Sequence, residues 1–216
     1  MRFRPLLYVS VAASAIYLLT ARWQPFPGSA LVKGCAVGAL ALLALRPRAE
    51  RQGAGVLALA LAFCTAGDIL LDLDPRLFAF GLGAFLLAHV TYIYLFARNR
   101  TSGGRLGARR VAAVVVILVY SGVLSAWIVP SVGALAVPVV VYICALTAMV
   151  CMAILARFRQ PWVAVGAVLF LISDSLIAIH KFKEPVPWRD VLVWSTYYLG
   201  QCGIALGYLV SGPAVS

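Results

Sequence analysis

Residues 56–74 read VLALALAFCTAGDILLDLD, and this stretch decides what kind of protein the chain forms. Its first part, 56–63, has no polar side chain, yet Asp68, Asp72 and Asp74 follow closely. The whole chain has 216 residues, of which 63% are hydrophobic and only 7 are acidic. A run this apolar is typical of a membrane-spanning helix. A carboxylate inside such a helix carries a high free-energy cost and usually has a function. We therefore ask what such aspartates do in so apolar a protein.

Apolar runs of similar length recur along the whole chain. The mean hydropathy is +0.99 and 12% of residues are charged, which excludes an ordinary soluble domain. The runs cover residues 5–21, 29–45, 54–72, 77–97, 110–128, 132–156, 162–180 and 190–211. Each can cross a hydrocarbon core of about 30 Å as a helix, which satisfies its own backbone hydrogen bonds. We expect an all-α membrane protein: eight transmembrane helices in one bundle, with residues 1–216 as a single integral membrane domain.

The net charge of +11 lies mainly in the short connections between these runs. In a soluble protein it would suggest nucleic acid, but with this distribution we expect no nucleic-acid partner. Most basic residues fall on one side of an eight-helix arrangement, at the N-terminus and around 46–51, 98–110 and 157–159. The positive-inside rule then predicts that both termini are cytoplasmic. Residues 1–15 are also compatible with a signal peptide, but the long apolar run favours a retained helix. The predicted location is the bacterial cytoplasmic (inner) membrane.

Ionisable side chains inside the predicted spans are the first candidates for function, because each costs about 2.5–3.5 kcal/mol near the bilayer centre. Asp68 and Asp72 share one helix face, and Asp68 lies about 6 Å deeper at 1.5 Å per residue. Asp72 is close enough to the interface to be either functional or simply solvated. Asp74 precedes Pro75 and is expected to be a turn residue at the helix end. Lys33 lies inside the second run.

The run 77–97 places Phe85, His89, Tyr92 and Phe96 along one helical stripe. Such a stripe is typical of helix packing. A histidine near mid-span nevertheless needs a polar partner, because hydrocarbon offers none. The expected partners of His89 are the carboxylates of the preceding helix.

The run 162–180 carries Ser173 and Asp174 after a long apolar stretch, and Lys181 follows on the same face two turns later. An Asp174–Lys181 structural pair is the simpler interpretation, but Asp174 is about six residues from the helix end, which favours a function. His180 is expected to be structural. The last run offers a further polar stripe: Tyr197, Gln201 and Tyr208, with Tyr198 beside it.

Asp68 and Asp174 are separated by about half the chain. Each follows a small residue late in the third helix of a four-helix set, and each is followed by polar groups on the fourth helix. We therefore predict two parallel four-helix repeats, about 1–108 and 109–216, related by an axis along the membrane normal. Each repeat would then supply one carboxylate of a pair, near the non-cytoplasmic side.

Three segments also carry a resemblance to a known family. GDILLDLDPRLFAFGLGAFLLAHVTYIYLF (67–96), GAVLFLISDSLIAIHKF (166–182) and YYLGQCGIALG (197–207) resemble the signature blocks of the YhhN / TMEM86 family. Members of that family are lysoplasmalogenases, integral membrane hydrolases that cleave the vinyl-ether bond of lysoplasmalogens. The products are a fatty aldehyde and glycerophosphoethanolamine or glycerophosphocholine. The resemblance implies the same activity here, with a lysophospholipid substrate drawn from the bilayer.

The resemblance also implies site residues. The family's proposed catalytic aspartates match Asp68 and Asp174. Other motif positions, with expected supporting or substrate-binding roles, fall on Asp72, His89, Tyr92, Ser173, Lys181, Tyr198 and Gln201. Tyr197 joins this set because it lies on the same stripe as Gln201. The blocks do not indicate a headgroup or chain preference, or an oligomeric state.

The implied chemistry fits two carboxyl groups. Protonation of the vinyl-ether β-carbon needs a carboxylic acid, and a second, ionised carboxylate can stabilise the resulting oxocarbenium ion, as in glycosidases. Asp174 is the preferred acid and Asp68 the preferred carboxylate, because Asp68 has Asp72 and His89 as polar neighbours. Lys181 would contact the headgroup phosphate, and the alkenyl chain would enter between helices from the lipid. No metal or organic cofactor is expected.

Two other interpretations remain open. One is another lipid hydrolase that binds zinc, for which the ligands would come from Asp68, Asp72, His89, Asp174 and His180. The other is a proton-coupled small-molecule transporter, in which buried acids at a repeat interface relay protons. Loss of activity on chelation would favour the first, and substrate-dependent proton flux in liposomes the second.

Overall fold

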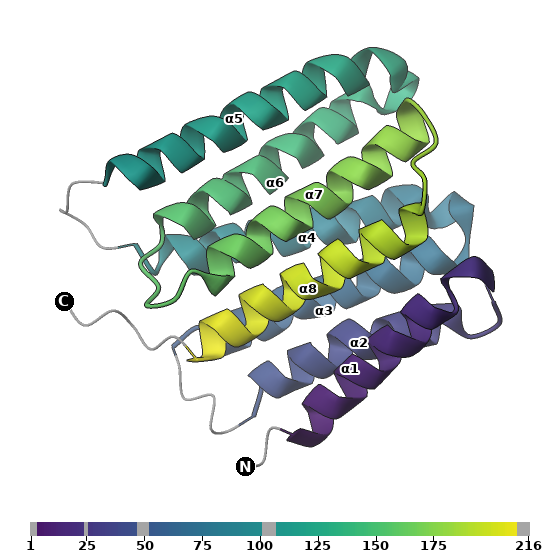
Figure 1. The fold of residues 1–216 in the computed structure, drawn as a ribbon, viewed down its shortest axis with the longest axis horizontal. Helices are drawn as coiled ribbons and strands as arrows, with labels where there is room; N and C mark the ends of the chain where they lie inside the picture. The colour runs from purple at the N-terminus through teal and green to yellow at the C-terminus, as the bar shows by residue number, and fades with distance from the viewer. Residues whose placement is uncertain (1–3, 24–25, 47–51, 101–106, 211–216) are drawn as a thin grey trace. The chain divides into compact units, whose positions relative to one another are not determined.

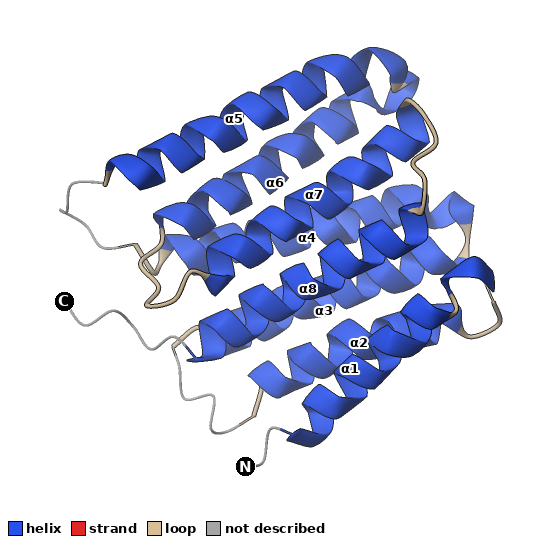
Figure 2. Ribbon diagram, in the orientation of Figure 1, coloured by secondary structure: helices blue, strands red, loops and turns tan. Residues whose placement is uncertain are grey.

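A computed structural model describes residues 4–23, 26–46, 52–100 and 107–210. Over these residues it contains eight α-helices and no β-strand, which confirms the predicted all-α class (Figures 1 and 2). Contacts between Cα atoms divide the chain into two compact units, Met1–Leu95 and Phe96–Ser216. The predicted single domain and the predicted repeats stay predictions.

Each unit is built from four helices in chain order. The first contains α1 (Arg4–Leu19), the 3₁₀ turn η1 (Ala21–Trp23), α2 (Ser29–Ala44), α3 (Ala54–Leu73), η2 (Pro75–Leu77) and most of α4 (Phe78–Ala97). The second contains α5 (Ala108–Ile128), η3 (Val129–Ser131), η4 (Gly133–Leu135), α6 (Ala136–Leu155), α7 (Trp162–Phe182) and α8 (Arg189–Val210). Most predicted runs agree with these bounds to within two or three residues.

The start of α6 is the main difference from the predicted runs. The run 132–156 was expected to be one helix, but α6 begins only at Ala136, after two 3₁₀ turns. Gly133 has a φ of 63°, in the left-handed region, so a right-handed helix cannot continue through it. Hydropathy does not detect this interruption, because every residue around it is apolar or small.

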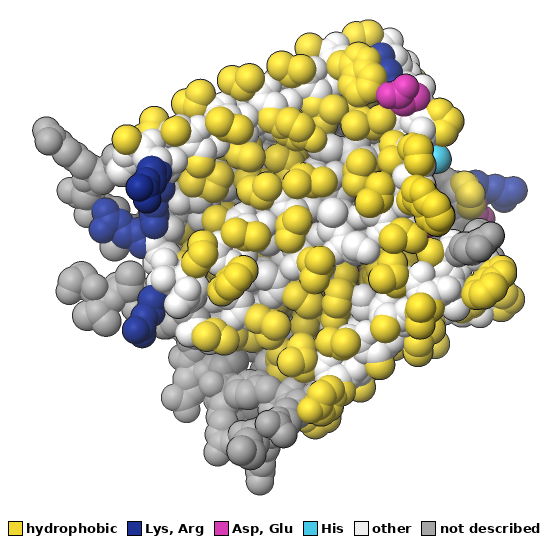
Figure 3. Space-filling model, in the orientation of Figure 1, with side chains coloured by type: hydrophobic (Ala, Val, Ile, Leu, Met, Phe, Trp, Pro, Cys, Tyr) yellow, Lys and Arg dark blue, Asp and Glu magenta, His cyan; other side chains and the backbone are white. Residues whose placement is uncertain are grey.

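Within the described residues, five helices are long and apolar enough to cross a membrane: α3, α4, α5, α6 and α7. The helices α1 and α2 have 16 residues each, about 24 Å at 1.5 Å per residue, which is shorter than a hydrocarbon core of about 30 Å. Hydrophobic side chains cover much of the visible surface, and Lys and Arg gather near helix ends (Figure 3). Eight transmembrane spans and cytoplasmic termini therefore stay predictions. The topology prediction depends on basic segments, parts of which (1–3, 47–51, 101–106) lie outside the described residues.

Local signals set the limits of α2 and α3. Gly28 (φ 92°) and Gly53 (φ 94°) precede these helices in the left-handed conformation that glycine adopts without strain. The helix α3 ends at Leu73 because Asp74 is extended before Pro75, as residues preceding proline tend to be. The Asp74 carboxylate accepts a hydrogen bond of 2.8 Å from the Arg76 backbone N–H. The prediction that Asp74 is a turn residue is confirmed.

Small residues let the helices of the first unit approach closely. The Ser10 hydroxyl of α1 donates a 2.6 Å hydrogen bond to the Ala36 carbonyl oxygen of α2. A Cβ atom on Gly34 of α2 would lie 2.8 Å from the Ile69 side chain of α3. Gly34 and Gly38 form a small-xxx-small pair, the pattern that brings membrane helices together. This close approach places the polar residues of α2 against those of α3.

Glycines also allow α3 and α4 to approach closely. A Cβ atom on Gly67 of α3 would lie 2.6 Å from the Phe85 ring of α4, and one on Gly81 of α4 would lie 2.6 Å from the Leu71 side chain. The C-terminal half of α3, which carries Asp68 and Asp72, is therefore packed against the first half of α4.

In the second unit, α7 and α8 touch through their backbones. A Cβ atom on Gly166 of α7 would lie 2.5 Å from the carbonyl oxygen of Gly200 on α8. One on Gly203 would lie 3.0 Å from the carbonyl oxygen of Trp162. At the other side of α7, buried apolar side chains around Ile128 join the ends of α5 and α6. This packing fixes the face of α7 that carries Ser173 and Asp174.

Candidate active site

The polar side chains of α1, α2 and α3 form one network in the first unit. Lys33 Nζ lies 3.6 Å from Asp68 Oδ1, and the two side chains are 16% and 2% exposed. The Tyr17 hydroxyl donates a 2.9 Å hydrogen bond to Asp72 Oδ1, and the Ser29 hydroxyl donates to Asp72 Oδ2. Lys33 Nζ also lies 5.6 Å from the centroid of the Tyr17 ring, within range of a cation–π interaction. Both aspartates of α3 are thus held by groups from other helices.

The two aspartates differ in their surroundings. Asp68 is buried and ion-paired, so its negative charge is balanced inside the protein. Removing one partner of such a pair typically costs about 3–5 kcal/mol, because the other charge is left in a low-dielectric interior. Asp72 is half-buried and bonded to two hydroxyls on two other helices. Asp72 thus has protein partners as well as partial exposure, and its supporting role stays a prediction.

His89 and Tyr92 are fully buried on α4. The Tyr92 hydroxyl is hydrogen-bonded to the thiol of Cys64, which lies on α3 one turn before Asp68. Along α4, His89 lies between Tyr92 and Phe85, and both of these residues contact α3. The predicted contact between His89 and the carboxylates of α3 stays a prediction.

Asp174 of the second unit is half-buried and bonded to α6. Its Oδ2 accepts a 2.6 Å hydrogen bond from the Tyr142 hydroxyl. The neighbouring Ser173 is fully buried and donates a 3.0 Å hydrogen bond to the Val193 carbonyl oxygen on α8. Asp174 and Ser173 therefore bind different neighbouring helices.

The predicted polar stripe of α8 lies inside the protein. Tyr197 meets the Phe170 ring edge-on, with centroids 5.2 Å apart. Tyr198 stacks on Trp194, with centroids 6.0 Å apart and an angle of 17° between the rings. Gln201, one turn further along α8, is fully buried. These side chains form an aromatic and amide cluster beside the Ser173 region of α7.

The end of α7 carries two exposed basic residues. Lys181 Nζ lies 6.0 Å from the centroid of the Phe182 ring, and a pairing of Lys181 with Asp174 stays a prediction. His180 Nδ1 accepts a 3.2 Å hydrogen bond from the Val186 backbone N–H, which fastens the following loop and agrees with the expected structural role. Across the described part of the chain, no three His, Cys, Asp or Glu side chains are grouped so that they could hold a metal ion.

Four residues that bond to Asp68, Asp72 or Asp174 were not among the predicted site residues: Tyr17, Ser29, Lys33 and Tyr142. Lys33 had a signal, because it is the only charged residue of the run 29–45. The two tyrosines and the serine had none, since hydroxyls are common in apolar helices. The predicted pairing of Asp68 with Asp174 involves both units and stays a prediction.

Comparison with known proteins finds relatives that cover most of the chain. The "Lysoplasmalogenase" of Mycobacterium bovis is 44% identical over 154 residues, which cover 69% of this chain and 58% of that relative, less than two thirds of its length. The "Lysoplasmalogenase TMEM86A" of Bos taurus is 31% identical over 186 residues, 82% of this chain and 72% of the relative. The "Lysoplasmalogenase TMEM86B" of Rattus norvegicus is 29% identical over 205 residues, 93% of this chain and 82% of the relative. No solved structure is significantly similar to the chain.

The profile of the YhhN family matches residues 28–208, a range that includes both candidate aspartates and every predicted supporting residue. This range covers most of the chain. The protein therefore belongs to the YhhN family.

Proposed function

We propose that this protein is a lysoplasmalogenase that hydrolyses the vinyl-ether bond of lysoplasmalogens in a membrane. The names of its relatives support the substrate class. The observation that carries the proposal is Asp68, which is 2% exposed, paired with Lys33 and located in an apolar helix. A carboxylate in such a place is costly, and its retention points to a chemical role.

Two aspartates divide the reaction between them. Asp174, as a carboxylic acid, transfers its proton to the β-carbon of the vinyl ether, which leaves an oxocarbenium ion. Asp68, as a carboxylate, stabilises this cation and accepts a proton from the water that attacks the carbon bonded to the ether oxygen. The hemiacetal then gives its hydroxyl proton to the Asp174 carboxylate while its bond to the glycerol oxygen breaks, and that oxygen takes the proton held by Asp68, so both aspartates return to their starting states. One water is consumed, and a fatty aldehyde and a glycerophospho-alcohol are released.

The contacts of each aspartate support this division of roles. The ammonium group of Lys33 faces Asp68, so Asp68 is suited to enter the reaction as the charged carboxylate. Lys33 acts through Asp68 and is a positioning residue. Asp174 accepts a hydrogen bond from Tyr142, and this contact fixes its orientation while its other oxygen can carry a proton.

We propose that all eight helices cross the membrane, with both termini in the cytoplasm and the two aspartates in parallel repeats. Five helices support this by length and composition. The helices α1 and α2 have only 16 residues each. They would span the membrane if the polar network at one end of the first unit lies in the interface and not in the hydrocarbon core. Placement in a bacterial inner membrane is part of the same proposal.

The test is release of free fatty aldehyde from a lysoplasmalogen by the purified protein in detergent. We expect the wild type to release aldehyde and Asp68→Asn and Asp174→Asn to release almost none. Asp190→Asn is the matched control, because Asp190 is exposed and pairs with its neighbour Arg189 at 2.7 Å. The control should keep wild-type activity.

Folding of each variant is measured beside its activity. Asp68→Asn leaves Lys33 without its partner, so the double variant Lys33→Met/Asp68→Asn provides an uncharged version of the same contact. If well-folded wild-type protein released no aldehyde, the proposed activity would be wrong. If folded Asp174→Asn protein kept most of its activity, the two-aspartate mechanism would be wrong while the activity stood.

A further inference from the structure

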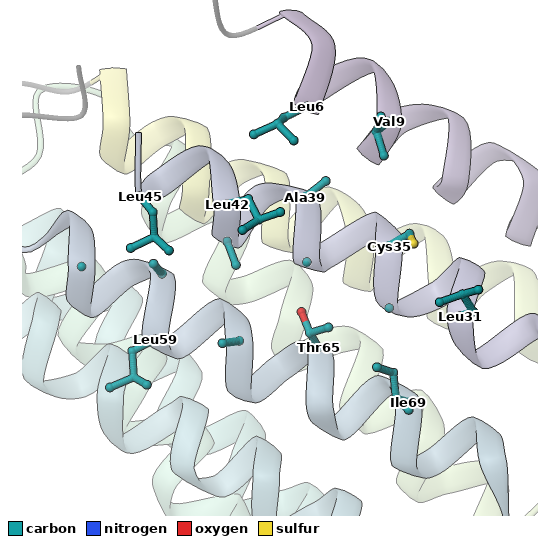
Figure 4. Close-up of a pocket in the computed structure, with 16 residues that line it drawn as sticks. Leu6, Val9, Leu31, Cys35, Ala39, Leu42, Leu45, Leu59, Thr65 and Ile69 are labelled. Carbon is teal, nitrogen blue, oxygen red and sulfur yellow. The ribbon is translucent and has the colours of Figure 1, made fainter. Parts of the chain in front are cut away.

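An apolar groove of about 730 Å³ runs along the first unit between α1, α2 and α3 (Figure 4). Leu6 and Val9 of α1, Leu42 of α2 and Leu59 of α3 are among the side chains that border it. Thr65 also borders the groove, but its hydroxyl donates a 2.8 Å hydrogen bond to the Leu61 carbonyl of its own helix. The groove therefore presents hydrocarbon to whatever occupies it.

The length of the groove suits a lipid chain. Its lining on α3 extends from Gly55 to Ile69, about 21 Å at 1.5 Å per residue. The chains of one leaflet span about half of a 30 Å hydrocarbon core, or about 15 Å. One complete alkyl chain therefore fits lengthwise.

One end of the groove lies at the level of the polar network described above. Ile69 follows Asp68 directly on α3, and Leu31, which also lines the groove, lies between Ser29 and Lys33 on α2. The opposite end, near Gly55 and Leu45, is apolar. Lys33 and Asp68 do not line the groove themselves, but an amphiphile with its chain in the groove would have its polar end at their level along α2 and α3.

We propose that this groove binds the alkenyl chain of the lysoplasmalogen, with the chain end toward Gly55 and the vinyl ether toward Asp68. This inference rests on the proposed function and adds to it the site that holds the chain. A chain enters sideways from the surrounding lipid, and chain length is then selected by the distance from Asp68 to the Gly55 end. The occupant is a single-chain lysophospholipid.

Two exposed cysteines give a direct test of binding that needs no catalysis. Cys35 lines the groove and is exposed and free, whereas Cys144 of α6 is exposed and free but does not line it. The probe is a saturated 1-O-alkyl lysophospholipid, which has no vinyl ether to cleave. At about ten times its Kd this lipid should slow alkylation of Cys35 by N-ethylmaleimide about tenfold. A short-chain lipid with the same headgroup should protect less, and Cys144 should be alkylated at an unchanged rate in both cases.

A second test shortens the groove. A Cβ atom on Gly55 meets nothing within 4 Å, so Gly55→Leu can be accommodated and fills the apolar end. Each methylene displaced from the groove should raise KM about fourfold for long chains, with short-chain substrates unaffected. Gly122→Leu of α5 is the matched control, because Gly122 also meets nothing within 4 Å and lies outside the groove.

The outcomes separate this inference from the proposed function. Aldehyde release without chain-dependent protection of Cys35 would overturn the groove and leave the hydrolase intact. Protection of Cys35 without aldehyde release would support the groove as a lipid site and overturn the hydrolase. Equal protection of Cys35 and Cys144 would show nonspecific coverage by lipid and overturn the groove. Equal loss of long- and short-chain activity in Gly55→Leu would also count against it.

Discussion

Replacing Lys33 by methionine removes the ammonium group that faces Asp68 and keeps most of the aliphatic side chain. The carboxylate that remains is only 2% exposed, so it cannot recover its lost partner from water. Breaking a buried pair in this way costs about 3–5 kcal/mol. Because Lys33 itself is 16% exposed, we expect a value near the lower end, about 3 kcal/mol. At roughly 2–4 °C per kcal/mol for a chain of this size, the Tm should fall by about 6–12 °C.

The assay is thermal unfolding of purified protein in one detergent, followed by intrinsic tryptophan fluorescence, for four proteins: wild type, Lys33→Met, Asp68→Asn and the double variant. We expect the double variant to be more stable than the sum of the single losses predicts, with a coupling energy of about 1–2 kcal/mol. Asp190→Asn removes an exposed pair and should cost no more than about 1 kcal/mol. Additive losses in the cycle, or a Tm of Lys33→Met equal to that of the control, would refute the ion pair as a structural contact of Asp68.

Three further predictions use the same purified protein. Lys33→Arg keeps the positive charge and should retain measurable aldehyde release where Lys33→Met retains little; equal activities would show that the charge is not used. Tyr142→Phe removes the 2.6 Å hydrogen bond to Asp174 and should lower both kcat and the free energy of unfolding, the latter by about 1 kcal/mol; unchanged kcat would leave this hydrogen bond without a catalytic role. Gly166→Ala places a methyl group 2.5 Å from a backbone oxygen of α8 and should cost about 1–3 kcal/mol in denaturant unfolding, while Gly122→Ala, with nothing within 4 Å, should cost nothing; equal effects would argue against the α7–α8 contact.

The helices themselves could be predicted from the sequence because the signals that limit them are local. Gly53 precedes α3, and the pair Asp74–Pro75 follows it, so the run 54–72 gave a helix that differs by one residue from Ala54–Leu73. The predicted start of α6 was wrong for an equally local reason. A positive φ at Gly133 leaves no trace in hydropathy, since glycine there is as apolar as its neighbours.

The ion pair of Asp68 could not be predicted from hydropathy, because it depends on how α2 is rotated against α3. Hydropathy does not fix this rotation, since α2 is apolar around its circumference except at Ser29 and Lys33. The rotation is set by Gly34 and Gly38, whose lack of side chains lets α3 approach. Their spacing was visible in the sequence, and Lys33 is adjacent to Gly34. Read together, these residues would have indicated a cation at the α2–α3 contact.

The direct backbone contact between α7 and α8 has a consequence for motion. Two helices whose backbones approach so closely at several glycines have little room to shift against each other. We therefore expect Ser173 and the aromatic cluster of α8 to move together in any helix displacement on the microsecond to millisecond timescale. Any widening of the second unit should occur at less tightly packed helix contacts, such as those of the largely exposed α5. Amide hydrogen exchange should be slowest in the α7–α8 hairpin, which we expect to be the last part of its unit to open.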